Sequence, residues 1–109
     1  MFIRLEEIKA EEVEKGVTRK ILGYDDQLMM VYATFKKGSV GYVHTHPHRQ
    51  VTYIAEGSFE VFIDGKKETL KKGDCYFIPP ELPHGTTALK DGILIDVFTP
   101  VREDFLEKQ

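Results

Sequence analysis

The sequence has one cysteine, no tryptophan and no apolar stretch long enough to cross a membrane. A single cysteine excludes a disulfide within the chain. Because Cys75 lies in the strand-like run 74–78, we expect a buried, unreactive thiol. The first fifteen residues carry a charge every few positions, which favours neither a secretion signal nor a membrane anchor. We therefore expect a cytoplasmic protein with no membrane partner.

A surplus of positive charge is also missing. Fifteen lysines and arginines stand against 18 aspartates and glutamates, which gives a formal net charge of -3. A phosphate backbone is negatively charged and attracts proteins with a positive net charge, so we expect no nucleic-acid partner. The length of 109 residues suits one compact domain spanning residues 1–109 better than two.

Long amphipathic helices are absent from the pattern. Apolar residues instead alternate with a period of two in short runs, separated by glycine, proline and charged turns, as is typical of an all-β sandwich or barrel. The predicted strands are residues 27–35, 51–55, 58–63, 66–70, 74–78 and 93–98. We predict one or two edge strands within the first 26 residues. We also predict a short helical tail at residues 103–109.

Two local segments have distinctive turn chemistry. Asp64-Gly65 lies between two predicted strands, which indicates a tight hairpin with both central residues at positive φ. Residues 79–85 contain three prolines, which cannot donate ladder hydrogen bonds. We predict a loop there, with His84 at its end.

The histidines suggest a metal site. His44 and His46 are separated by one residue in a predicted strand, so both imidazoles would project from one face and converge on one ion. Gln50 follows at the start of the next strand, and His84 comes a hairpin later. Only a barrel that curls back on itself would bring all four together.

The same residues fall on two motifs that resemble those of the cupin superfamily. The family's first motif, G-x5-H-x-H-x3-E-x6-G, matches Gly38, His44, His46 and Gly57, with Gln50 in place of glutamate. Its second motif, G-x5-P-x-G-x2-H-x3-N, matches Gly73, Pro79 and His84, with Glu81 and Ala88 as departures. The resemblance covers residues 38–88. It implies a double-stranded β-helix, or jelly-roll, barrel that holds one divalent transition metal (zinc, nickel, manganese or iron) with His44, His46, Gln50 and His84.

The glutamine in this set has an electrostatic consequence. Three neutral imidazoles and one amide oxygen leave the double positive charge of the ion uncompensated, which favours Lewis-acid chemistry on an anionic substrate. Oxygen-activating iron sites more often contain a carboxylate, so the glutamine weighs against that chemistry without excluding it. His48 follows a proline, and we expect it to contact solvent or to support a ligand rather than to bind metal.

Within the cupins, the sequence is most similar to those of small pectin-degradation proteins that linearise 4,5-unsaturated monouronates. The similar segments are residues 43–53, 78–80, 83–85, 96–98 and 102–105. Arg49 departs from this family, which more usually has glutamate beside the metal-binding glutamine. An aspartate, a phenylalanine and an arginine line the substrate site in that family, and the resemblance places these roles on Asp96, Phe98 and Arg102.

The residues themselves support these three roles unequally. Asp96 shares one strand face with Leu94 and Phe98, which favours a pocket, although solvent exposure is the usual position for an aspartate. Arg102 could bind a substrate carboxylate, but without the resemblance a surface charge is the simpler interpretation.

The function expected from the resemblance is ring opening and ketonisation of an anionic sugar. The alternatives are another metal-dependent cupin enzyme, such as a dioxygenase or a sugar isomerase, or a module that binds sugar or metal without turnover. Exposed edge strands in the N-terminal part, together with the resemblance to small cupins, also predict a homodimer.

Overall fold

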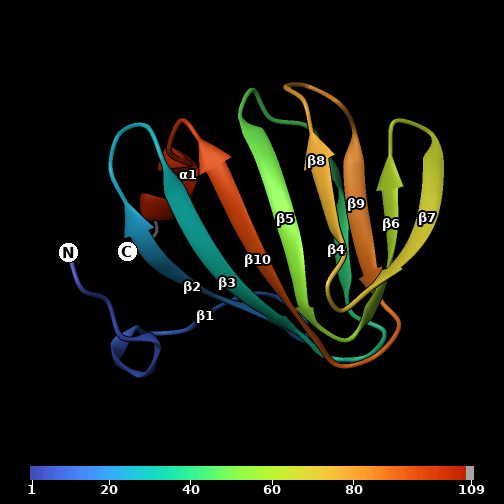
Figure 1. Ribbon diagram of the computed structural model, residues 1–109, viewed down its shortest axis with the longest axis horizontal. Helices are drawn as coiled ribbons and strands as arrows, with labels where there is room; N and C mark the ends of the chain where they lie inside the picture. Colours follow the sequence, from blue (N-terminus) through green and yellow to red (C-terminus); the bar gives the residue numbers. More distant parts are fainter. Residues whose placement is uncertain (108–109) are drawn as a thin grey trace.

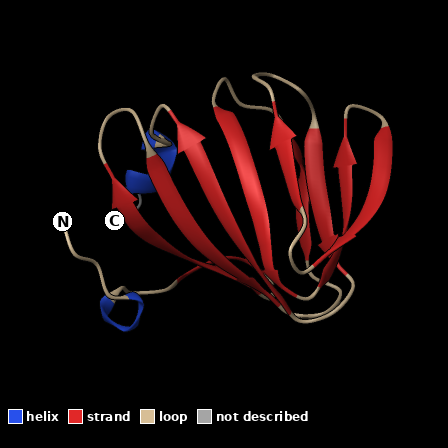
Figure 2. Ribbon diagram, viewed as in Figure 1, coloured by secondary structure: helices blue, strands red, loops and turns tan. Residues whose placement is uncertain are grey.

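The computed structural model describes residues 1–107, which form two antiparallel β-sheets facing each other (Figures 1 and 2). The larger sheet has the order β1-β2-β3-β10-β5-β8, and the smaller one β4-β9-β6-β7. The strands are β1 (Glu11–Glu14), β2 (Val17–Tyr24), β3 (Met29–Phe35), β4 (Val40–His44), β5 (Arg49–Glu56), β6 (Ser58–Ile63), β7 (Lys66–Lys71), β8 (Cys75–Ile78), β9 (His84–Ala88) and β10 (Gly92–Thr99).

Two short helices complete the described chain. The 3-10 helix η1 (Leu5–Glu7) precedes the first strand, and α1 (Glu103–Leu106) follows the last one. Neither has the length or the apolar content that a membrane crossing requires, and no other helix occurs between residues 1 and 107. The predicted tail is helical over these four residues, and its end at 108–109 lies outside the described residues.

The predicted all-β jelly roll is confirmed. The strand predicted at 58–63 matches β6, and the other five predicted runs overlap β3, β5, β7, β8 and β10. The hairpin between β6 and β7 turns at Asp64 (φ 48°) and Gly65 (φ 86°), both at positive φ as predicted. The first 26 residues contain two strands, of which β1 lies at the sheet edge and β2 is paired on both sides.

Three local predictions are wrong. Cys75 is exposed, because β8 directs Cys75 and Phe77 outward and Tyr76 and Ile78 inward. The predicted loop ends early, since β9 begins at His84 and the prolines only precede it. His46 lies beyond the end of β4, so it does not share a strand with His44.

The core fills the space between the sheets. Its larger cluster includes Phe35 and Phe59, whose rings meet edge to face with centroids 5.3 Å apart. A smaller cluster joins Met29, Phe98 and Val101 with the partly buried helix residue Phe105. Burial of this apolar surface is the main stabilising contribution to a domain of this kind.

Strand register decides which polar side chains enter the interior. Asp96 pairs with Thr52 and Phe98 pairs with Gln50 between β10 and β5, so all four project from the same face. In the other sheet, His44 at the end of β4 pairs with His84 at the start of β9. Both sets lie toward one end of the barrel, where β4 and β10 end and β5 and β9 begin (Figure 1).

Candidate metal centre

Three imidazoles meet at this end of the barrel. His44, His46 and His84 each offer a nitrogen, and these nitrogens all lie within 4.8 Å of one another. The ring centroids are 4.4 Å apart for His44 and His84, and 4.7 Å apart for His46 and His84. Since metal–nitrogen bonds are about 2.1 Å long, small side-chain rotations would bring all three onto one ion.

A glycine allows the two sheet strands of this cluster to approach closely. A Cβ atom on Gly85 would lie 2.9 Å from the carbonyl oxygen of Gly41 on the neighbouring strand. The absence of that atom lets β9 lie against β4 and brings His84 next to His44. The glycine therefore contributes to the cluster without offering a ligand.

Backbone carbonyl groups orient each histidine ring. Nδ1 of His44 donates to the Tyr42 carbonyl at 2.8 Å, and Nδ1 of His84 donates to the Leu82 carbonyl at 2.9 Å. Nδ1 of His46 donates to the His48 carbonyl at 3.1 Å. Because a carbonyl oxygen only accepts, these contacts fix the proton on Nδ1 and leave Nε2 free to bind a metal.

The free nitrogen of His84 is the clearest sign that the site fits a cation. Its Nε2 is buried and has no hydrogen-bond partner among the described residues. A buried polar atom without a partner is costly, and a metal ion would satisfy it. Burial, together with the neighbouring His44, His46 and Arg102, lowers the pKa of His84 to about 4, against the hydrogen bond to Leu82. The imidazole is therefore neutral at pH 7, as metal binding requires.

Gln50 supplies a fourth donor atom. Its amide Nε2 donates to the Thr52 hydroxyl at 2.8 Å, which directs Oε1 toward His46. Oε1 then lies 3.0 Å from Nε2 of His46, and burial lowers the pKa of that imidazole. An amide oxygen facing an unprotonated ring nitrogen places two lone pairs together, an arrangement that a shared cation would stabilise.

The predicted carboxylate lies beside these donors. Asp96 accepts a hydrogen bond from the Thr52 hydroxyl at 2.6 Å and a longer one from Gln50 at 3.4 Å. Burial raises the pKa of Asp96 to about 6, although Thr52 and Arg102 both act in the opposite direction. Its side chain lines a cavity of about 130 Å³ together with His44, Gln50, His84, Phe98 and Arg102.

Arg102 is buried, contrary to the surface position that the residues alone suggest. It is 8 % exposed, and its Nε and Nη2 atoms donate to the two carboxylate oxygens of Asp104 at 3.0 and 2.9 Å. The guanidinium carbon lies 4.2 Å from the ring centroid of Phe105 and 5.1 Å from that of Phe98. The start of α1 thus holds a cation at the edge of the cavity.

Phe98 forms an apolar wall next to the imidazoles. It is 2 % exposed, and its ring centroid lies 5.8 Å from that of His46 in an edge-to-face arrangement. Phe105 meets Phe98 edge to face on another side, at 5.6 Å. These rings limit the access of water to this side of the cavity.

The two remaining predictions concern residues beside the ligands. His48 does not join the cluster: its Nε2 donates to the Val101 carbonyl at 3.1 Å, while its own carbonyl orients His46. Arg49 is exposed on the face of β5 opposite Gln50, so it lies away from the cavity.

Sequence reasoning missed Thr52, Tyr76 and Phe105 as parts of the site. Thr52 could have been found, because it follows Gln50 at the strand period of two. Tyr76 requires the pairing of β8 with β5, and Phe105 requires the placement of α1, neither of which a local pattern specifies.

Two facing antiparallel sheets with an imidazole cluster between them are the architecture of a cupin, and the match to a family model agrees with this assignment. The chain belongs to the cupin family, whose Cupin domain matches residues 31–98. Within that family it is 48% identical to the pectin degradation protein KdgF of Dickeya dadantii over 98 residues, which cover 88% of this chain and 89% of that protein.

Solved structures give the same result. The structure of KdgF from Halomonas sp. superimposes with a TM-score of 0.93 at 38% identity, covering 96% of this chain and 97% of that one. An RmlC-like cupin from Shewanella frigidimarina superimposes with a TM-score of 0.91 at 45% identity, covering 94% and 92% of the two chains.

Proposed function

We propose that this chain is a metal-dependent enzyme of pectin or alginate breakdown, which opens and ketonises 4,5-unsaturated monouronates. The single observation that carries the proposal is the buried, unpartnered Nε2 of His84 in a cavity that also holds Asp96 and Arg102. Similarity to KdgF, a pectin degradation protein by name, supports the substrate class.

The ligand set suits this chemistry. His44, His46, Gln50 and His84 would hold one divalent ion, and none of the four carries a negative charge when bound. Such an ion supplies a Lewis acid that polarises an oxygen on which negative charge develops. The donors suit zinc, nickel, manganese and iron alike.

Arg102 would bind the substrate carboxylate. Its Nε and Nη2 edge is held by Asp104, which leaves the Nη1 side of the guanidinium available for a second carboxylate. A charge-assisted contact of this kind would hold the sugar ring in the cavity that His44, His84 and Phe98 line.

Asp96 would move the proton. Ring opening breaks the bond between C1 and the ring oxygen, and ketonisation adds a proton at C4, so the proton lost from the C1 hydroxyl balances the one gained by carbon. A carboxyl group with a pKa of about 6 can both accept and release a proton near neutral pH. The apolar wall of Phe98 would keep water from competing for these steps.

The test follows the ultraviolet absorbance of the conjugated double bond in a 4,5-unsaturated galacturonate monomer. Metal-loaded wild type should remove the absorbance without a change in substrate mass, because the reaction is an isomerisation. His46→Ala, Asp96→Ala and Arg102→Ala should be slow, and His48→Asn should keep most of the activity. A rate equal to buffer for the wild type would contradict the proposal.

Other outcomes of this assay correspond to the alternatives. Oxygen consumption with bound iron would indicate a dioxygenase, and uronate binding without a new product would indicate a binding module. We also propose that the protein forms a homodimer. Its cytoplasmic location stays a prediction from the sequence.

A further inference from the structure

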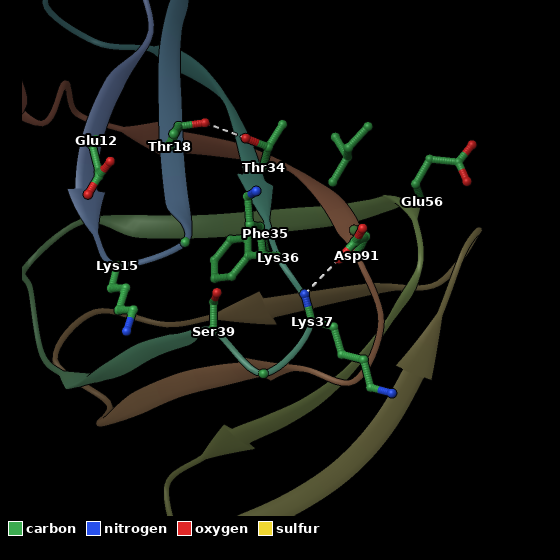
Figure 3. A pocket seen from close by; sticks show the side chains of 14 residues that line it. Glu12, Lys15, Thr18, Thr34, Phe35, Lys36, Lys37, Ser39, Glu56 and Asp91 are labelled. Atoms are coloured by element: carbon green, nitrogen blue, oxygen red, sulfur yellow. Dashed lines mark hydrogen bonds between the residues drawn. The ribbon is translucent and has the colours of Figure 1, made fainter.

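A second arginine is buried on the inward face of the larger sheet, and the proposed function gives it no role. Arg19 lies on β2, is 8 % exposed and has the buried residues Val17 and Ile21 on either side of it on the same strand face. Its neighbour Thr18 points to the other side of β2 and bonds Thr34 in the groove of about 1050 Å³ that Figure 3 shows. Burial of a charged side chain is costly unless it has partners, so the surroundings of Arg19 need an explanation.

One carboxylate neutralises the charge of Arg19. Glu11 is its register partner on the edge strand β1, and Oε1 of Glu11 accepts a hydrogen bond from Nε at 2.9 Å. The Nη2 atom of Arg19 lies 2.6 Å from the same oxygen, but it is buried and forms no hydrogen bond within residues 1–107. Because one oxygen of Glu11 makes both contacts along one edge, the rest of the guanidinium stays available for another partner.

That partner is the ring of Phe105 in α1. The guanidinium carbon of Arg19 lies 3.7 Å from the ring centroid, and that of Arg102 lies 4.2 Å from the same centroid. At these distances each guanidinium is in van der Waals contact with the ring, and one ring face has room for only one such group. The two arginines therefore hold Phe105 between them, one on each face.

Helix α1 has few other attachments to the sheets. It is four residues long, too short to be stable alone, and Arg102 at its N-cap makes no capping bond with its side chain. Within the described chain, the hydrogen bonds of residues 102–107 are all made inside the segment 101–107. The packing of Phe105 and Leu106 on the smaller core cluster, together with the contact with Arg19, therefore holds α1 in place.

We propose that Arg19 is a positioning residue for Arg102, an inference that rests on the proposed function. Arg19 holds one face of Phe105, and the other face holds the plane of the Arg102 guanidinium, while Asp104 holds its edge. Arg102 then presents its remaining side to the cavity that it lines. A substrate carboxylate would meet a guanidinium that is already oriented, which lowers the entropic cost of binding.

Glu11 has a part in this arrangement, because two guanidinium groups around one ring repel each other. Each cation has a carboxylate of its own, on β1 for Arg19 and on α1 for Arg102, so the stack as a whole carries no net charge. Without Glu11, the charge of Arg19 would act on Arg102 through the poorly screened interior. The stack thus connects the edge strand of the larger sheet with the proposed substrate site.

The first test replaces Arg19 by lysine, which keeps a charge for Glu11 but has no planar group to cover Phe105. Arg19→Lys should raise KM for the 4,5-unsaturated galacturonate about fivefold and leave kcat and metal affinity nearly unchanged. Arg49→Lys makes the same change at an exposed arginine on β5 and should leave KM as in wild type. An unchanged KM in Arg19→Lys, or a fall in kcat alone, would overturn the proposal.

A double substitution tests whether Arg19 acts through Phe105. Phe105→Leu keeps an apolar side chain on α1 but removes the ring between the two guanidinium groups. If the ring transmits the effect, the addition of Arg19→Lys to Phe105→Leu should not raise KM any further. If the two single effects multiply in the double variant, Arg19 does not act through Phe105 and the proposal fails.

The Nε–H signal of Arg102 in a nitrogen–proton correlation spectrum gives a readout that needs no substrate. Asp104 protects this proton from exchange and the ring of Phe105 shifts its resonance, which is assigned by its loss in Arg102→Lys. Arg19→Lys should move the signal toward that of a solvated arginine, whereas Arg49→Lys should leave it in place. A signal that moves in a protein without uronate turnover would support the coupling of the two arginines and contradict the proposed function alone. A signal that stays in place would contradict the positioning role itself.

Discussion

The hydroxyl of Thr52 donates a hydrogen bond of 2.6 Å to Oδ1 of Asp96. The same hydroxyl accepts from the Gln50 amide at 2.8 Å, so one buried side chain orients both a proposed metal ligand and the proposed proton carrier. A valine has the same shape but lacks the oxygen, which makes Thr52 the residue whose removal separates orientation from packing.

Thr52→Val should weaken metal binding about 10- to 100-fold, as loss of a partner that orients a ligand commonly does. Competition with a fluorescent chelator measures this affinity, and Thr52→Ser, which keeps the hydroxyl, is the control. An affinity equal to wild type in the valine variant would show that Gln50 needs no such support.

His84→Ala should abolish the response of the protein to a chelator. In wild type, removal of the metal should lower the midpoint of thermal unfolding, because a ligand that binds only the folded state stabilises it. The alanine variant should unfold at a lower temperature and should not respond to the chelator. His48→Asn is the matched control, since His48 lies beside the cluster but bonds the Val101 carbonyl. Equal metal content in both variants would argue against the ligand assignment.

Gln50→Glu should bind the metal more tightly and turn over the uronate more slowly. The added carboxylate strengthens the attraction for a divalent ion but reduces the net positive charge that the substrate meets. Metal titration and the absorbance assay together measure the two effects. Faster turnover would contradict the argument from charge.

Asp104→Asn should raise KM for the uronate several-fold and leave kcat nearly unchanged. Asp104 fixes two edge atoms of Arg102, and this contact also lowers the pKa of the Asp104 carboxyl. The amide variant would hold the guanidinium less firmly before substrate arrives. Glu103→Gln removes the same charge from the adjacent residue and should have no such effect. A fall in kcat alone would contradict a role in substrate positioning.

The free energy of unfolding should decrease at alkaline pH because the phenol of Tyr76 is buried. Burial, with a contribution from Asp96, raises the pKa of the Tyr76 phenol above its ordinary value of 10.0. Its contribution is fully present below pH 10 and is lost as pH rises toward the folded-state pKa, because the unfolded chain then releases a proton that the folded chain keeps. The free energy of unfolding should fall by up to about 1.4 kcal/mol per pH unit from this group. Chemical denaturation of wild type and Tyr76→Phe between pH 9 and 11 should show the smaller slope in the variant.

Local chemistry predicted much of the fold. The turn at Asp64 and Gly65 followed from residues that tolerate positive φ, and β6 followed from strict alternation. The prediction for Cys75 failed because alternation alone does not say which face of a strand is covered. The burial of Arg102 likewise depends on where α1 folds back, which no neighbouring residue determines.

The candidate site could also be predicted only in part from the sequence. The proposed ligand set rests on spacing and resemblance, and the structure brings its three histidines together. The reason given for His44 and His46 was wrong, since a turn after β4, and not a shared strand face, brings them together. Thr52 shares the inward face of β5 with Gln50, so strand alternation could have marked it. Tyr76 contributes through a cross-strand pair with Thr52, 24 residues away, and no local pattern marks it.

Each imidazole is oriented by a carbonyl group only two residues away along the chain. The hydrogen bonds that set ring direction are therefore specified within very short peptides, and none of them involves a side chain of β10 or α1. Residues 99–105 can consequently diverge in evolution, or be exchanged by an engineer, to accept a different anionic molecule while the hydrogen bonds that orient the three imidazoles are kept. In such a scaffold, the residues that orient the imidazoles and the residues that select the substrate can change independently.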